Sequence, residues 1–310
     1  HDVYSYVDYA RLGLRHGLDP YVHPPLAAPA DPAFAEVTWT ESTSAYGPLF
    51  TLLTYPLAWL PVGAAVAVLK AVAAFSVLGI AALVSRMAAW RGTDPLRAAA
   101  FVALNPLVLV HVVGGAHNDG LTMLLATLSV AALLSARELS GGATLVAAIA
   151  TKVSAAFLAP FALLGSRRKD RLLLGASLAA LAVLAAAWLA FGWDWLQGFG
   201  LAGENQSRTS YMSIPITTAR LTGLDPGAVR LAAAVLFAAT VAYLLAWTWR
   251  GGDWVRAAAW TALALLLATS WLLPWYLVWA LPLVAISRDR TLMALTLALT
   301  AYQLGARIPL

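Results

Sequence analysis

Apolar residues form long uninterrupted segments along most of the chain, and short polar breaks rich in turn-forming residues separate them. Several segments reach or approach the roughly 20 residues that a helix needs to cross the hydrocarbon core of a bilayer. The clearest of them are residues 62–84, 172–191 and 228–249. This pattern predicts an all-α fold, a polytopic transmembrane helical bundle.

The positive charges in the breaks predict which side of the membrane each break faces, because cytoplasmic loops are enriched in lysine and arginine. One alternating set of breaks holds 12 of the 20 cations and five of the 15 acids, whereas the other holds six cations and ten acids. This topology has about ten crossings, in which residues 143–164 form two short helices that meet near Lys152 as a hairpin. The cation-rich set, which we assign to the cytoplasm, comprises residues 86–97, 137–138, 167–171, 250–256 and 288–290.

Residues 1–61 are predicted to form the first outer loop, with short interfacial helices. The first 45 residues or so are too polar and too rich in proline and aspartate to span the membrane. No repeat of fixed period divides the chain, so we predict a single transmembrane domain over residues 1–310. The chain starts with His1, and no signal peptide is visible. We therefore expect a fragment whose natural N-terminus is missing.

The composition excludes a water-soluble globule. Hydrophobic residues make up 61% of the chain and charged residues only 11%, against about 25% charged residues in ordinary soluble domains. The net charge of +5 is not the footprint of a nucleic-acid partner. Cysteine is absent, which rules out a disulfide, a thiolate metal site and a cysteine nucleophile. We expect neither a metal nor a cofactor.

The first outer loop combines acidic and aromatic residues that could line a sugar pocket. Asp2, Tyr6 and Asp8 lie within one stretch of eight residues, and Tyr46 lies near the end of the loop. Aromatic faces stack on pyranose rings, and carboxylates accept hydroxyl protons. The alternative is an interfacial aromatic belt with solvated acids.

A second polar cluster, His117-Asn118-Asp119, lies where one predicted helix ends outside and the next begins. Such a group could act as a base or hydrogen-bond relay for a polar ligand. The alternative is that Asn118 or Asp119 caps the following helix.

Three cations and one aromatic pair complete the candidate site. Lys152 lies within apolar sequence, and a charge inside the bilayer is costly enough to require a partner. That partner would be a phosphate or an acid. Arg208 and Arg220 are outward cations available to a phosphate or, equally, to the outer acids. Trp275 and Tyr276 adjoin a proline break at the outer surface, where an aromatic belt is the alternative.

Seven short motifs, in this order, resemble the polyprenol-phosphate-mannose-dependent α-1,6-mannosyltransferases of actinobacterial lipomannan synthesis, members of the GT-C superfamily. The resemblance covers nearly the whole chain. The motifs are Asp-Val-Tyr-Ser-Tyr at 2–6, Gly-Leu-Asp-Pro-Tyr at 17–21, Tyr-Gly-Pro-Leu-Phe at 46–50, Asn-Pro at 105–106, Gly-Gly-Ala-His-Asn-Asp at 114–119, Thr-Lys-Val-Ser at 151–154 and Pro-Trp-Tyr at 274–276.

This resemblance implies an inverting transferase of the bacterial plasma membrane that works at its outer face. It implies a polyprenyl-phosphate-mannose donor, a glycolipid or glycan acceptor, and membrane lipids as surroundings. Asp2 matches the catalytic carboxylate of the first outer loop, and His117 and Asp119 are carried over as site residues. Family members have a helix before this loop, so we expect the first transmembrane helix and the C-terminal end to be missing. The predicted substrate-binding residues are Tyr6, Asp8, Tyr46, His117, Asn118, Asp119, Lys152, Arg208, Arg220, Trp275 and Tyr276.

The acidic residues of the predicted outer loops agree with a transfer reaction that needs a base. A polyprenyl phosphate leaves as a stable anion, so only the acceptor hydroxyl needs help from a base. A transporter or lipid flippase is the rival interpretation, because it too would have short helices and intramembrane charges. A non-catalytic structural subunit is a third. The missing repeat and the concentration of acids on one face argue against a transporter.

Overall fold

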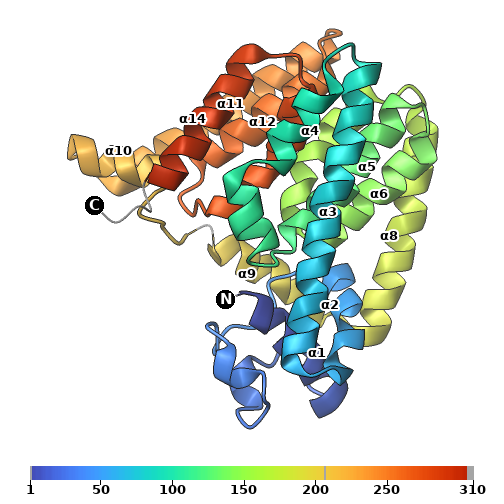
Figure 1. The fold of residues 1–310 in the computed structure, drawn as a ribbon, viewed down its shortest axis with the longest axis vertical. Helices are drawn as coiled ribbons and strands as arrows, with labels where there is room; N and C mark the ends of the chain where they lie inside the picture. Colours follow the sequence, from blue (N-terminus) through green and yellow to red (C-terminus); the bar gives the residue numbers. More distant parts are fainter. Residues whose placement is uncertain (1, 206, 306–310) are drawn as a thin grey trace.

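The computed structural model describes residues 2–205 and 207–305, and within them it contains helices and no strands (Figure 1). This confirms the all-α prediction for the described residues. The first half of the chain forms α1 (Asp2–His16), η1 (Pro25–Ala27), η2 (Phe34–Glu36), α2 (Pro48–Thr54), η3 (Tyr55–Trp59), α3 (Val62–Trp90), α4 (Pro95–Ala103), η4 (Val108–Val113), α5 (Asp119–Leu134) and α6 (Glu138–Thr151). The second half forms η5 (Val153–Leu158), α7 (Ala159–Gly165), α8 (Lys169–Phe191), η6 (Asp194–Leu196), α9 (Gln197–Asn205), α10 (Ile214–Thr222), α11 (Pro226–Trp249), α12 (Trp254–Ala268), η7 (Pro274–Trp279), α13 (Leu281–Ile286) and α14 (Arg290–Gly305).

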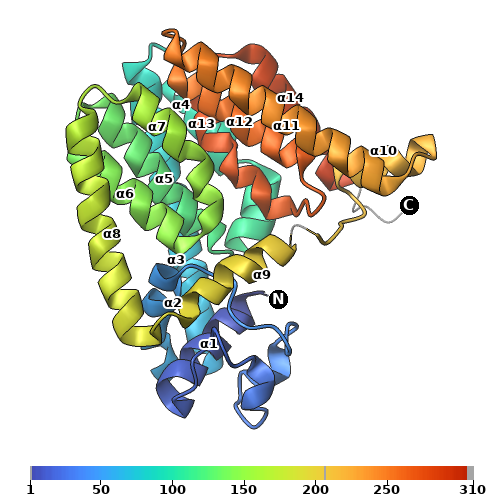
Figure 2. The ribbon, with the colours of Figure 1, turned by 180° about the vertical axis from the view of Figure 1, so that it is seen from behind.

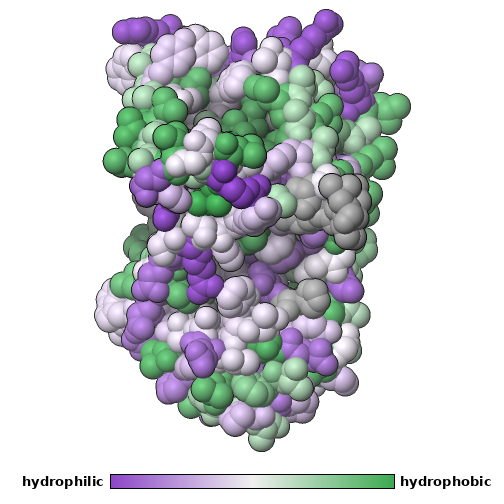
Figure 3. Space-filling model, turned by 90° about the vertical axis from the view of Figure 1, so that its left-hand side faces the viewer, coloured by the Kyte–Doolittle hydropathy of each residue, from purple (hydrophilic) through white to green (hydrophobic). Residues whose placement is uncertain are grey.

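Three of the described helices, α3, α8 and α11, are long and apolar enough to cross a membrane. In α11 only 6% of the apolar window is buried within the protein, which suits a helix that faces lipid. The space-filling view shows apolar side chains over the upper part of one face and polar side chains around a hollow below them (Figure 3).

About ten full crossings were predicted, and the structure does not confirm that number. The 16-residue helix α5 extends only about 24 Å at 1.5 Å per residue, which is shorter than the roughly 30 Å core of a bilayer. One of the ten predicted crossings covers residues 98–113. It is not one continuous helix, because α4 ends at Ala103 and the π-helical turn η4 starts at Val108. Between them, Pro106 cannot donate a helical hydrogen bond.

The predicted hairpin of short helices is present. Helix α6 ends at Thr151, and Lys152 is extended before η5 and α7 continue the chain. Glu138, at the start of α6, accepts hydrogen bonds from the Ser166 hydroxyl and the Arg167 backbone at the end of α7. The segment therefore returns to the level at which it began, and Lys152 lies at the far end.

Breaks from the cation-rich set meet at one end of the molecule, as the predicted topology requires. Arg91 pairs with Asp253 and donates to the carbonyl of Ile286, and Arg256 pairs with Asp289. Figures 1 and 2 show these loops at the top, opposite α1 and α2. The side of the membrane that this end faces stays a prediction.

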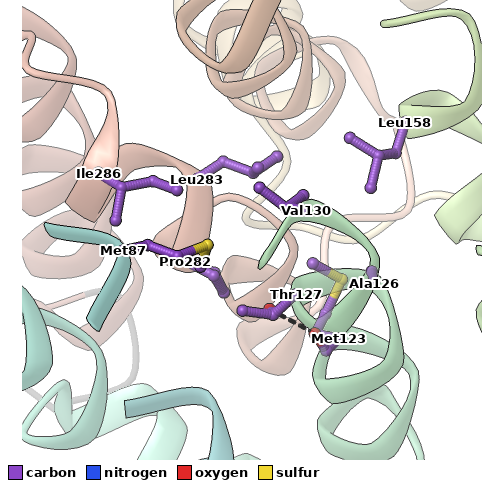
Figure 4. Close-up of a pocket in the computed structure, with 9 residues that line it drawn as sticks. All are labelled: Met87, Met123, Ala126, Thr127, Val130, Leu158, Pro282, Leu283 and Ile286. Atoms are coloured by element: carbon purple, nitrogen blue, oxygen red, sulfur yellow. Dashed lines mark hydrogen bonds between the residues drawn. The ribbon is translucent and has the colours of Figure 1, made fainter. Parts of the chain in front are cut away.

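The helix bundle above α1 has a dry interior. Side chains of α3, α5, η5 and α13 surround a gap of about 10 Å³ (Figure 4). Its walls are almost wholly apolar, with Met87, Met123 and Leu283 among them. This volume is at the lower limit for one water molecule and far too small for a sugar or a lipid. The polar chemistry lies elsewhere, near the N-terminus of α1.

Candidate active site

The candidate site lies where α1, the turn before α5, the break after α6 and η7 come together. Asp119 begins α5 and is fully buried. Lys152 Nζ lies 2.9 Å and 2.7 Å from its two carboxylate oxygens, and Trp279 Nε1 donates to Oδ1 at 2.6 Å. The partly exposed Lys152 thus has an acid partner. The hydrogen-bond donors to the Asp119 carboxylate are side chains of the protein itself, Lys152 and Trp279. This carboxylate is therefore not free to act as a base.

An aromatic wall covers this ion pair. Lys152 Nζ is 5.3 Å from the ring centre of Tyr276 and 5.8 Å from that of Trp279, within cation–π range. The Tyr276 and Trp279 rings stack with their centres 4.1 Å apart. Trp275, next in the same wall, stacks on His117 at 3.7 Å with the rings 14° from parallel. Trp275 and Tyr276 therefore lie beside the polar cluster, and their role in binding a substrate stays a prediction.

His117 connects the aromatic wall to α1. Its Nδ1 lies 3.5 Å from Asp2 Oδ2, longer than a normal hydrogen bond. Burial lowers the pKa of His117 to about 4, although Asp2 and Asp119 oppose this effect. The imidazole is therefore neutral near pH 7. Ala116, just before it, has a left-handed φ of 52°, a strained conformation of the kind that clusters at functional sites.

Asp2 is the most accessible acid of the cluster, with 21% of its side chain exposed. Trp39 Nε1 donates to its Oδ1 at 3.1 Å, which fixes the orientation of the carboxylate. The Arg208 guanidinium lies 4.9 Å from the ring centre of Trp39 and 5.9 Å from that of Trp271. The rings of Trp39 and Trp271 thus place Arg208 next to the site, and its role in binding stays a prediction.

Tyr6, Tyr46 and Asn118 lie behind Asp2. Tyr6 meets Tyr46 edge to face at 4.8 Å, and its hydroxyl accepts from the Asn118 backbone at 3.5 Å. Burial raises the pKa of Tyr6 well above its usual value, so the hydroxyl stays protonated. The Asn118 side chain is buried, yet neither its amide nitrogen nor its oxygen has a hydrogen-bond partner among the described residues. A buried amide that stays unpaired costs about 1–3 kcal/mol, so both polar atoms of this side chain are open to a polar partner.

Two predicted site residues lie elsewhere. Asp8 is buried, and the charged groups that influence it are Asp31, His16 and Arg11, because a helix places positions 2 and 8 on different faces. Arg220 is exposed on α10, where its guanidinium stacks 3.6 Å from the ring centre of Tyr211. The structure therefore does not place Asp8 or Arg220 in the cluster around Asp2.

Sequence reasoning missed Trp39 and Trp279, the two tryptophans that bind the carboxylates of Asp2 and Asp119. Trp279 follows Tyr276 by three residues, a spacing that puts both on one side of a 3-10 helical turn and could have identified it. Trp39 has no such signal, since only the tertiary fold brings it to Asp2. Within the described residues, no three His, Cys, Asp or Glu side chains are placed to hold a metal ion.

Comparison with known proteins gives a consistent result. A family model described as "Alpha-(1->6)-mannopyranosyltransferase, N-terminal domain" matches residues 1–168. Alpha-(1->6)-mannopyranosyltransferase A of Mycobacterium tuberculosis is 31% identical over 320 residues, which cover 92% of this chain and 60% of that protein. The protein of the same name from Corynebacterium glutamicum is 30% identical over 165 residues, or 52% of this chain and 33% of its own length. The chain thus spans 60% of the length of the first relative and 33% of that of the second. No solved structure matches it.

Proposed function

The chain belongs to the alpha-(1->6)-mannopyranosyltransferase family, and from this premise we propose that it transfers mannose from a polyprenyl-phosphate donor to a glycolipid or glycan acceptor. The reaction takes place at the outer face of the bacterial plasma membrane and inverts the anomeric carbon. One observation carries the proposal: the accessible carboxylate of Asp2 lies beside His117, in a cluster whose buried Asn118 side chain has no hydrogen-bond partner among the described residues.

In this mechanism Asp2 is the general base. The acceptor oxygen bonds to C1 of mannose as the bond from C1 to the phosphate oxygen breaks, and the hydroxyl proton moves to Asp2. The phosphate leaves with the bonding electrons, so it needs no acid. Trp39 holds one oxygen of Asp2, which leaves the other oxygen for the acceptor. The Asn118 amide can donate to and accept from sugar hydroxyls at the same time.

The donor phosphate needs positive charge nearby, because an uncompensated anion in a low-dielectric site is costly. Lys152 has 19% of its side chain exposed despite its bond to Asp119. Its ammonium has three donors, so one stays available to a phosphate oxygen. Arg208, over Trp39, supplies a second cation on the side of Asp2.

The decisive experiment measures mannose transfer from a synthetic, radiolabelled polyprenyl phosphate mannose in membranes that contain the full-length protein. Asp2→Asn keeps the size of the side chain and removes its basicity, so turnover should fall by roughly 10²- to 10⁴-fold, with little change in donor affinity. Asp8→Asn is the matched control, because it removes a carboxylate from the same helix outside the cluster. Near-normal turnover of Asp2→Asn would remove Asp2 from the role of base.

The rival interpretations make a different prediction. A transporter or flippase would move the lipid without forming a glycosidic bond, and a structural subunit would do neither. The family match favours a transferase over both classes. Absence of any radiolabelled glycan product from the wild-type protein with a range of acceptors would favour these alternatives over a transferase.

A further inference from the structure

Helix α1 has two functional faces. Asp2, Tyr6 and Tyr9 recur at helical spacing and lie toward the candidate active site and Tyr46. Tyr4, Arg11 and Arg15 follow the same spacing on the opposite side of the helix. This second face lines an open cavity of about 660 Å³, whose other walls are the 32–36 loop and residues 59–63, where η3 leads into α3. The cavity is distinct from the Asp2 cluster.

The side chains around this cavity have the chemistry that recognises a sugar. Trp59 is 65% exposed, so its ring face is open to a ligand. The Arg15 guanidinium lies 5.6 Å from the centre of that ring. Glu36, also exposed, adds a carboxylate acceptor. A flat aromatic surface with a donor and an acceptor beside it fits a pyranose ring with its hydroxyls, whereas Glu36 would repel a ligand that offers only phosphate.

The walls of the cavity are fixed by one buried ion pair. Arg11 is 3% exposed, and its Nε bonds to Asp31 Oδ1 at 2.7 Å. Its Nη1 donates to the carbonyl of Ala58 at 3.1 Å. The same arginine therefore joins α1 to the loop that carries Glu36 and to the η3 turn that carries Trp59. Although burial opposes ionisation, hydrogen bonds from Arg11, the Ala33 amide and other neighbours lower the pKa of Asp31 to about 2.

We propose that this cavity is a second sugar-binding subsite, which holds a part of the acceptor glycan away from its reacting end. The inference rests on the proposed function. Its volume lies within the 300–1,000 Å³ typical of small-molecule sites, so it has room for a short oligosaccharide. Tyr4 lines the cavity only two residues from Asp2, so the cavity extends to the end of α1 that carries Asp2, and one glycan of several sugar units can contact both.

Direct binding tests this subsite without relying on catalysis. The full-length protein in lipid nanodiscs is titrated with methyl α-mannoside and with an α-1,6-linked mannose hexasaccharide. Trp59→Ala should weaken hexasaccharide binding about tenfold, and Glu36→Gln should weaken it in the same direction. Trp90→Ala is the matched control, since Trp90 is an exposed tryptophan with Arg86 5.9 Å from its ring centre at the other end of α3.

The kinetic counterpart separates this subsite from the reacting centre. In Trp59→Ala the loss of kcat/KM should be about tenfold larger for the hexasaccharide acceptor than for methyl α-mannoside, whereas Asp2→Asn should reduce both equally. A wild-type protein that binds the hexasaccharide no better than the monosaccharide would overturn the proposal. So would hexasaccharide affinity that is equal in the wild type, Trp59→Ala and Glu36→Gln.

Two further outcomes are informative. If Trp59→Ala loses binding of glycerol phosphate but not of the hexasaccharide, the cavity is a lipid headgroup site and the proposal is wrong. If the wild type transfers no mannose, the proposed function fails, but weaker hexasaccharide binding in Trp59→Ala would still support a glycan subsite. The binding and transfer measurements therefore distinguish the two failures.

Discussion

Lys152 and Asp119 form a two-pronged ion pair at the break after α6, with Lys152 Nζ 2.7 Å and 2.9 Å from the carboxylate oxygens. Asp119 is fully buried, and Trp279 is its third donor. Because burial of the Asp119 charge is expensive, the pair contributes little net stability, but loss of Lys152 leaves the Asp119 charge uncompensated. The pair fixes the positions of α5, α6 and η7 around the candidate site.

Lys152→Met is expected to destabilise the protein by roughly 3–5 kcal/mol, because Asp119 would keep its buried charge without a partner. The double variant Lys152→Met with Asp119→Asn should recover most of this loss, since it removes the charge and keeps an acceptor for Trp279. Thermal unfolding in detergent measures both effects. Unchanged unfolding of Lys152→Met would show that the ion pair does not hold this part of the fold.

The sequence predicted part of this site for physical reasons. An unpaired charge in an apolar segment requires a partner, so Lys152 was identifiable, and the polar turn at residues 117–119 was identifiable by contrast with the apolar helices around it. The partnership between the two could not be predicted, because it depends on tertiary packing. Asp8 was misplaced since residues 2–16 were not recognised as a helix. The number of crossings stays a prediction, because the length of an apolar segment does not show where a helix breaks, and three of the described helices are long enough to span.

Asp8 should make the stability depend on pH. Burial raises the pKa of this carboxyl from 3.8 to about 7, and nearby Asp31 adds to the effect. The folded state therefore holds a proton that the unfolded state loses, so this stabilisation is complete below pH about 4 and disappears as the pH rises through 7. Asp8→Asn should unfold at a higher temperature than the wild type at pH 8 and at nearly the same temperature at pH 4.

The control for this effect is Asp194→Asn, which removes an exposed carboxylate. It should leave the difference in unfolding temperature between pH 4 and pH 8 as it is in the wild type. Because each pKa unit is worth 1.36 kcal/mol, the rise of about three units in the pKa of Asp8 changes the free energy of unfolding by at most about 4 kcal/mol. An Asp8→Asn protein that is less stable than the wild type at pH 8 would contradict a protonated Asp8.

Gly47 is expected to be intolerant of any side chain. Its amide donates to the carbonyl of Thr151 at 3.2 Å, and a Cβ at this position would collide with the carbonyl of Ala150. The contact joins the residue before α2 to the end of α6, next to Lys152. Gly47→Ala should cost about 1–3 kcal/mol of stability and reduce transfer. Gly200→Ala, with open space around it, is the control, and equal unfolding temperatures for the two variants would refute the close contact.

The side of the membrane occupied by each end of the bundle can be tested in a chain that has no cysteine. Single cysteines at Arg167 and Ser207 should react with an impermeant thiol reagent from opposite sides, the first from the cytoplasm and the second from outside. Arg167 is preferable to its neighbour Ser166, because Ser166 is buried against Glu138 and would react slowly, whereas Arg167 and Ser207 are both exposed. The expectation rests on the excess of cations at the Arg167 end. Labelling of both positions from one side would contradict the topology and remove the candidate site from the outer face.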